Sequence, residues 1–147
     1  MTLESLLALR ANKTIVFTNG VFDVLHAGHV DYIIKAKALG DYLIVALNTD
    51  SSVSRLKGPS RPINFLEDRM KVIAALRCVD CVVSFDEDTP ERVIGDIKPD
   101  IHVKGGDYSI ESLPESKIVQ AYGGKVVILP LLEGRSSTRI IDKFSSE

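Results

Sequence analysis

The chain has 147 residues, of which 45% are hydrophobic and 26% charged, and this composition is typical of one soluble globular domain. A net charge of −2 gives no global basic field, so nucleic acid is not an expected partner. The N-terminus lacks the basic region of a signal peptide, and no apolar run reaches the length of a membrane span. We therefore expect a cytoplasmic protein without a membrane partner.

Strands are predicted to alternate with helices along the chain. Leucines within residues 1–12 favour a short N-terminal helical extension, followed by a strand over Lys13–Phe17 and a helix over Val30–Leu39. Tyr42–Leu47 is an almost continuous apolar run, as expected of a strand that is covered on both faces of a parallel sheet. Three further strands are predicted at Cys81–Phe85, Ile101–Lys104 and Lys125–Leu129.

Residues that start and stop helices separate these strands. Asn48–Ser52 is a polar segment that is able to cap a short helix, and Asn64 is predicted to cap the next helix, with Glu67 at the capping-box position. Thr89 and Pro90 are expected to begin a third helix as its cap and first residue. The last two helices are predicted near Pro114–Tyr122 and after Ser136 or Ser137. This alternation predicts a single Rossmann-like, doubly wound α/β domain with a five-stranded parallel sheet.

Cys78 and Cys81 form a Cys-x-x-Cys pair between a predicted helix and a predicted strand. A zinc site needs two more ligands at matching spacing, and none is evident. A redox pair usually opens a helix, whereas this pair leads into an apolar run. We therefore expect small buried residues at a helix-to-strand transition.

The segment Thr18–His29 lies between the first predicted strand and helix. A helix N-terminus presents free backbone N–H groups and the positive end of the helix dipole, both of which favour a bound phosphate. His26 and His29 lie three residues apart where this helix begins, and Gly28 lets a ligand approach the backbone closely. The segment therefore predicts an anion site with two histidines.

Three other loops follow predicted strands and contain the glycines, hydroxyls and cations that phosphates require. They are Asn48–Arg61, Lys104–Tyr108 and Glu133–Thr138. In parallel α/β sheets, ligands bind at the carboxyl ends of the strands, where these loops meet. The four loops together predict a phosphate-rich ligand.

Two stretches carry a resemblance to a known family. Asn19–Asp23 (NGVFD), followed by His26–His29 (HAGH), resembles the signature of the cytidylyltransferase-type nucleotidyltransferases. Gly134–Thr138 (GRSST) resembles the family's second nucleotide-binding motif, at the start of the last helix. The resemblance extends from about Thr14 to Phe144, and it implies one nucleotidyltransferase domain over residues 1–147 and a homodimer or a larger homo-oligomer.

Further stretches narrow this resemblance to one branch of the family. They are Arg55–Gly58 with Arg61–Asn64, Val103–Tyr108 and Ser137–Ile141. The branch transfers AMP from ATP to D-glycero-β-D-manno-heptose 1-phosphate in lipopolysaccharide biosynthesis. In many bacteria such a domain is fused behind a sugar kinase domain. The 147-residue sequence contains no kinase domain, so we expect the stand-alone form. The sequence departs from the family pattern at one place, where it has Ser-Ser-Thr-Arg and a Ser-Thr-Thr type sequence is common. Ser137 and Thr138 keep the hydroxyl groups, and Arg135 and Arg139 lie beside them in the sequence.

The resemblance also implies a role for each candidate residue. His26 and His29 would donate hydrogen bonds to phosphate oxygens, and Lys57, expected in a flexible loop, would be the mobile cation between the substrates. No general base is needed, because a phosphate monoester with a second pKa of about 6 is already an anion. Mg²⁺ is expected as cofactor, bound mainly by the substrate phosphates. The residues expected to bind the nucleotide are Thr18, Asn19, Gly20, Phe22, Gly28, Lys104, Gly105, Asp107, Arg135, Ser136, Ser137 and Thr138. The candidates for substrate or phosphate contact are Asp23, Arg61 and Arg69.

Structural roles compete with some of these assignments. Asp23 and Asp107 are possible Mg²⁺ contacts, but Asp23 is nearly as well explained as a brace for its turn. Arg69 is about as consistent with a surface ion pair as with a ligand contact, and His102 is expected to be a core histidine.

Two other functions compete with the leading one. A related transferase would use another small phosphate, such as glycerol 3-phosphate with CTP or a flavin phosphate with ATP. A non-catalytic nucleotide-sensing module is a different class, and the presence of His26, His29 and Lys57 argues against it.

Overall fold

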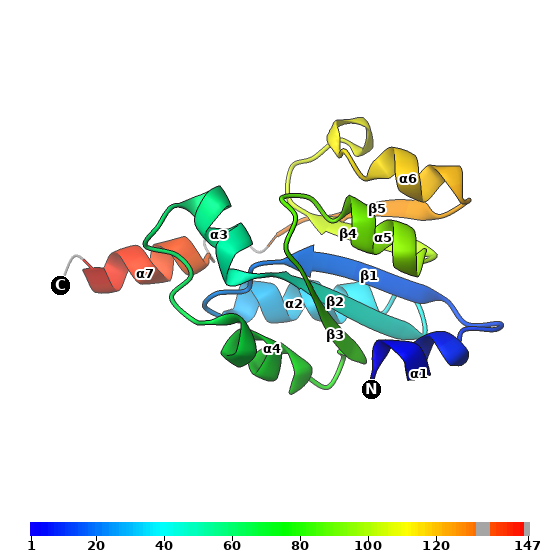
Figure 1. Cartoon of the computed structure of the whole chain (residues 1–147), viewed down its shortest axis with the longest axis horizontal. Helices are drawn as coiled ribbons and strands as arrows, with labels where there is room; N and C mark the ends of the chain where they lie inside the picture. The colour runs from blue at the N-terminus through cyan, green and yellow to red at the C-terminus, as the bar shows by residue number, and fades with distance from the viewer. Residues whose placement is uncertain (132–135, 146–147) are drawn as a thin grey trace.

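The computed structural model describes residues 1–131 and 136–145 of the chain. A sheet in which all neighbouring strands run parallel forms the centre of this part (Figure 1). Its strands are β1 (Ile15–Gly20), β2 (Tyr42–Asn48), β3 (Cys81–Phe85), β4 (Ile101–Gly105) and β5 (Lys125–Leu129). The strand order is β3-β2-β1-β4-β5, so the direction of winding reverses between β1 and β4. The predicted doubly wound α/β class with five parallel strands is confirmed.

Helices cover both faces of the sheet and connect its strands. They are α1 (Leu3–Ala8), α2 (Ala27–Lys37), α3 (Asp50–Lys57), α4 (Leu66–Ala74), α5 (Glu91–Ile97), α6 (Ser116–Ala121) and α7 (Ser137–Ser145), with a 3₁₀ turn at Ile110–Ser112. In Figure 1, α2 lies behind the sheet and α5 in front of it, while α7 extends to one side. None of the helices described is long and apolar enough to cross a membrane.

The central strand β2 shows how the sequence produces two cores. Leu43, Val45 and Leu47 belong to the cluster that includes residues of α2 and α4. Ile44 and Ala46 belong to the cluster that includes α5 and α6. Because successive side chains of a strand point to opposite faces, a continuous apolar run is required when helices cover both faces. The predicted burial of this strand is confirmed.

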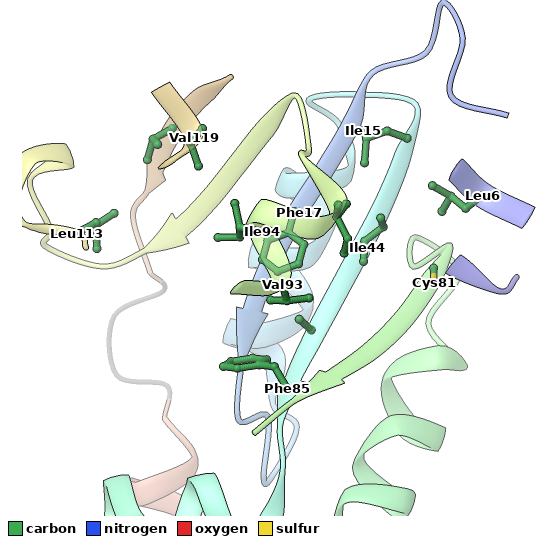
Figure 2. Close-up of a cluster of buried hydrophobic side chains, with 13 residues drawn as sticks. Leu6, Ile15, Phe17, Ile44, Cys81, Phe85, Val93, Ile94, Leu113 and Val119 are labelled. Atoms are coloured by element: carbon green, nitrogen blue, oxygen red, sulfur yellow. The ribbon is translucent and has the colours of Figure 1, made fainter. Parts of the chain in front are cut away.

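The second of these clusters fixes α5 against the middle of the sheet. Figure 2 shows Phe17 of β1 and Ile44 of β2 beside Val93 and Ile94 of α5. Phe17, Ile44 and Ile94 are completely buried. Leu6 of α1 packs in the same cluster, so the N-terminal helix is part of the core of the domain.

Several element boundaries differ from the predicted ones. β1 continues to Gly20, and α2 already begins at Ala27, so the turn between them is shorter than expected. Lys57 was predicted to lie in a flexible loop, but it is the last residue of α3. Gly58, with φ of 103°, ends the helix. These shifts place functional candidates on regular elements instead of on loops.

The predicted caps of α4 and α5 are wrong. Phe65, not Asn64, is the N-cap of α4, and it makes no side-chain capping bond. The Asn64 side chain donates instead to the backbone carbonyl of Asp23. Pro90, not Thr89, is the N-cap of α5. By contrast, Thr49 caps α3 by accepting a hydrogen bond from the backbone N–H of Ser52, within the segment predicted to do so.

The Cys-x-x-Cys pair lies between α4 and β3, at the helix-to-strand transition where it was predicted. Cys81 is buried at the start of β3, and Cys78 is partly buried just before it. Burial raises the pKa of both thiols, which is the opposite of what a reactive cysteine requires. Across residues 1–131 and 136–145, no group of three or more His, Cys, Asp or Glu residues is arranged to bind a metal ion.

Candidate active site

A pocket of about 360 Å³ opens at the carboxyl ends of β1 and β4, where the winding of the sheet reverses. Ligands of open α/β sheets bind at this topological position. The walls come from the β1–α2 turn, the end of α3, the end of β4 and the start of α7. The predicted site residues that line it are Asn19, Gly20, Phe22, Asp23, His26, Gly28, His29, Lys57, Arg61, Lys104, Gly105, Ser136 and Thr138.

His26 and His29 cap the helix on which they lie. His26 is the N-cap of α2, and its Nδ1 accepts a hydrogen bond from the backbone N–H of Gly28 at 3.0 Å. In return, Nδ1 of His29 accepts from the backbone N–H of His26 at 3.4 Å. This is the reciprocal arrangement of a capping box, made here by two imidazoles. The rings stack with their centroids 3.8 Å apart.

The caps determine where each imidazole carries its proton. Because Nδ1 of both rings accepts an N–H, the neutral form carries its hydrogen on Nε2. Burial lowers the pKa of His26, and burial together with the charges of His26 and Lys57 lowers the pKa of His29 to about 4. Without ligand, both rings are therefore neutral Nε2–H donors at neutral pH.

Phe22 holds His29 from the other side. The two rings meet edge to face with centroids 5.0 Å apart. Phe22 has a positive φ of 48°, which turns its ring back over β1. A Cβ at Gly20 would lie 2.8 Å from that ring, so glycine is needed there for the close approach.

Asp23 connects the β1–α2 turn to the segment between α3 and α4. Its buried carboxylate accepts hydrogen bonds from the backbone N–H groups of Ile63 and Asn64 and from Nε of Arg61. Burial alone raises the pKa of Asp23, but these three donors outweigh it and hold the pKa below its ordinary value. Of the two roles considered from the sequence, the structure supports the brace, because three protein donors already occupy the carboxylate oxygens.

Among the described residues, three cations line the same pocket as the histidines. Lys57 at the end of α3, Arg61 after it and Lys104 at the end of β4 all line the walls. Loss of hydration lowers the pKa of Lys57, and the charge of Arg61 adds to this effect. The Lys104 ammonium also lies 5.5 Å from the centre of the Tyr108 ring, in cation–π range. The pocket therefore has a locally positive wall in a chain of net charge −2.

A model of the cytidylyltransferase-like family matches residues 17–143, which include all of these elements. The chain belongs to the cytidylyltransferase-like family. It is 55% identical over 148 residues to the bifunctional protein HldE of Pseudomonas fluorescens strain SBW25, covering 97% of this chain and 31% of that protein. It is 59% identical over 135 residues to the bifunctional protein HldE of Ectopseudomonas mendocina strain ymp, covering 92% and 28%. The chain thus spans about three tenths of the length of these relatives.

Solved structures share the cytidylyltransferase-like architecture. The lipopolysaccharide core biosynthesis protein from Thermoplasma volcanium GSS1 is similar with a TM-score of 0.66 and 30% identity, over 84% of this chain and 99% of that one. Pantoate-beta-alanine ligase from Francisella tularensis has a TM-score of 0.61 and 17% identity, over 99% of this chain and 77% of that one. At that identity the second similarity concerns the fold alone.

Some predicted members of the cytidylyltransferase-like site do not line the pocket. The Thr18 hydroxyl is completely buried and is bonded to the Tyr32 hydroxyl and the carbonyl of Val103, so it lies behind the pocket wall. Asp107 is exposed and is not among the lining residues. Arg135 and the Ser137 side chain lie outside the described residues.

Arg69 is neither a surface residue nor a pocket residue. It is 1% exposed, and its guanidinium donates to the carbonyls of Val21, Asn48 and Asn64 and to the carboxylate of Asp50. These donations satisfy the buried guanidinium and join the ends of β1 and β2 to α4. Its role is structural, and the proposed phosphate contact is not supported.

The structure adds residues that sequence reasoning missed. Val21, Tyr32, Tyr108 and Leu131 also line the pocket. Tyr32 is a buried residue of α2 whose hydroxyl is hydrogen-bonded to Thr18 and to the carbonyl of Val103, and none of the sequence motifs pointed to it. His102 is buried beside Phe17, as predicted, but it also contacts the Glu115 carboxylate at 2.9 Å, far along the chain.

The caps predict the titration of His29 in the ligand-free protein. We expect nitrogen NMR shifts to show the Nε2–H form at pH 7 and a transition near pH 4 in place of 6.5. Because the folded pKa lies below the unfolded one, stability falls as the pH drops from 6.5 through 4. The same nucleus in urea-unfolded protein is the control and should titrate near 6.5. An Nδ1–H form, or a folded-state transition near 6.5, would contradict this description.

Proposed function

We propose that this chain transfers AMP from ATP to D-glycero-β-D-manno-heptose 1-phosphate, giving ADP-heptose and pyrophosphate for lipopolysaccharide biosynthesis. The observation that carries the reaction type is the pocket in which two Nε2–H histidines at a helix N-terminus face Lys57 and Arg61. The acceptor is supported by the identity of 55% and 59% to two HldE proteins and by the similarity to an archaeal lipopolysaccharide core biosynthesis protein.

The reaction is an in-line displacement at the α-phosphorus of ATP. An oxygen of the acceptor phosphate forms the new P–O bond, the bond to the β-phosphate oxygen breaks, and pyrophosphate leaves with the electron pair. No proton must move, because the attacking phosphate is already ionised with a second pKa of about 6. The chain therefore needs to align the substrates and to stabilise negative charge.

The residues of the pocket fit this requirement. His26 and His29 would donate from Nε2 to the oxygens of the triphosphate, beside the positive end of α2. Neutral donors can stabilise the developing charge here, since hydrogen bonds aimed at such charge act strongly in a partly dehydrated site. Lys57 would supply positive charge between the two substrates, beside the α-phosphate. Ser136 and Thr138 would contact the phosphates from the start of α7.

Mg²⁺ is the proposed cofactor, in the form of its complex with ATP. The described residues offer no carboxylate cluster for it, and Asp23 already accepts three protein hydrogen bonds. These residues do not form a protein-built Mg²⁺ site, so phosphate oxygens and water would be its main ligands. We further propose a cytoplasmic homodimer or larger homo-oligomer with ATP and the sugar 1-phosphate as its small-molecule partners.

A substrate panel tests the function. The purified protein is incubated with ATP, CTP, GTP or UTP and with heptose 1-phosphate, glycerol 3-phosphate or a flavin phosphate, and pyrophosphate release is followed. We expect turnover with ATP and heptose 1-phosphate. Turnover with CTP and glycerol 3-phosphate would contradict the proposed acceptor. ATP binding without turnover of any pair would favour a nucleotide-sensing module.

Replacing His26 by Asn separates its two roles. The Asn side-chain oxygen is among the best N-cap groups and takes the place of Nδ1, but nothing replaces the Nε2–H. We expect the variant to keep its melting temperature and to lose about 10²–10³-fold in kcat, the usual effect of removing one such donor. An unchanged kcat would show that His26 serves only as a cap. His26→Gln is the matched variant, because it offers a donor near Nε2 and loses the cap.

A further inference from the structure

Arg61 has a hydrogen-bond donor that the protein leaves unused. Its side chain is nine-tenths buried and lines the pocket. Nε donates to the Asp23 carboxylate at 2.9 Å, but the buried Nη2 has no hydrogen-bond partner among the described residues. A buried guanidinium nitrogen without a partner is costly, and native proteins rarely retain one without a function. An acceptor supplied by a ligand would satisfy it.

Asp23 fixes the direction in which this donor points. The carboxylate side chain is 1% exposed and also accepts the backbone N–H groups of Ile63 and Asn64. Its ion pair with Arg61 uses Nε and leaves the buried Nη2 without a hydrogen-bond partner among the described residues. A guanidinium is a rigid planar donor, so fixing one nitrogen also fixes the other two. Asp23 therefore orients Arg61 without using its full binding capacity.

The local charge favours a dianion at this place. Lys57 lines the same wall, and the charge of Arg61 contributes to lowering its pKa, which means that the two cations interact. One carboxylate, that of Asp23, faces these two cations. The N-terminus of α2, where His26 and His29 offer neutral donors, lines the same pocket, and the charge of Lys57 contributes to lowering the pKa of His29. The two cations therefore add positive charge to a pocket that already offers two neutral donors.

We propose that Nη2 of Arg61, together with Lys57, binds the phosphate group of the acceptor, and that Asp23 is the positioning residue for Arg61. This inference rests on the proposed function, which brings a phosphate monoester into the pocket beside ATP. Such a group has three terminal oxygens. If Arg61 and Lys57 each hold one, the third remains free to attack the α-phosphorus. The arrangement selects acceptors with a terminal phosphate and does not depend on the sugar.

Inorganic phosphate is the direct probe of this subsite. The protein is first saturated with α,β-methylene ATP, which cannot transfer AMP, and phosphate is then titrated in by calorimetry. We expect Arg61→Gln to weaken phosphate binding about tenfold to a hundredfold, because a charge-assisted hydrogen bond is lost. The affinity for the ATP analogue should change less than about threefold. Equal phosphate affinity in Arg61→Gln and the unaltered protein would overturn the proposal.

Arg55→Gln is the matched control. Arg55 lies on the exposed side of α3 and pairs with Asp86 and Asp88, away from the pocket lining. The substitution removes the same charge from the same segment of the chain. It should leave the affinities for phosphate and for the ATP analogue unchanged. A loss as large as that of Arg61→Gln would show that general charge, and not the Arg61 subsite, attracts phosphate.

A double-mutant cycle tests the role of Asp23. If Asp23 acts through Arg61, Asp23→Asn weakens phosphate binding in the unaltered background and has no further effect in Arg61→Gln. Fully additive losses would contradict a positioning role. If Asp23→Asn does not fold, Arg61→Lys takes its place, because lysine keeps the charge but cannot contact Asp23 and phosphate together. Its phosphate affinity should then be as low as that of Arg61→Gln, and a normal affinity would contradict the positioning.

Turnover separates a failure of the subsite from a failure of the proposed function. With heptose 1-phosphate, Arg61→Gln should raise KM for the acceptor about tenfold or more and change kcat and KM for ATP much less. Phosphate binding that depends on Arg61 without any turnover would leave the subsite standing and reject the heptose acceptor. Normal turnover by Arg61→Gln with an unchanged acceptor KM would reject the subsite and leave the function standing.

Discussion

The hydrogen bonds between two histidines and the first turn of α2 determine much of the site. A helix N-terminus leaves backbone N–H groups without partners, and here His26 and His29 satisfy two of them through Nδ1. The same contacts orient both rings, stack them at 3.8 Å and assign the proton to Nε2. The contacts that cap the helix therefore also orient the hydrogen-bond donors of the site, because the capped helix already presents two neutral Nε2–H groups.

Buried charges in the β1–α2 turn, in α4 and in the segment between α3 and α4 hold this part of the pocket in place. Asp23 binds Arg61 and the backbone around Asn64, while Arg69 joins the ends of β1 and β2 to the start of α4. Both ionic groups are almost completely buried, and both are saturated or nearly saturated by protein partners. A buried charge with all its partners fixed contributes rigidity more surely than stability. The position of Lys57 relative to the histidines follows from these contacts.

Sequence patterns predicted the fold and most of the pocket, but not the long-range polar contacts. The apolar run of β2 sufficed for a two-sided parallel sheet, and the His-x-x-His spacing located the helix N-terminus. Asn64 was misassigned as a cap because its actual partner, Asp23, is 41 positions away. Arg69 was misassigned for a similar reason, since local sequence does not reveal that three of its four acceptors lie 19 to 48 positions away. The hydrogen bonds to Nδ1 of the two histidines were likewise not predictable from the sequence and are seen only in the structure.

We infer that the N-terminus of α2, with its two Nε2–H donors, binds the triphosphate. A crystal structure of the protein with α,β-methylene ATP and Mg²⁺ tests it most directly. We expect phosphate oxygens at about 2.7–3.1 Å from Nε2 of His26 and His29, with both Nδ1 caps intact. A triphosphate bound away from α2, or histidines that turn and release their caps to reach it, would contradict this inference.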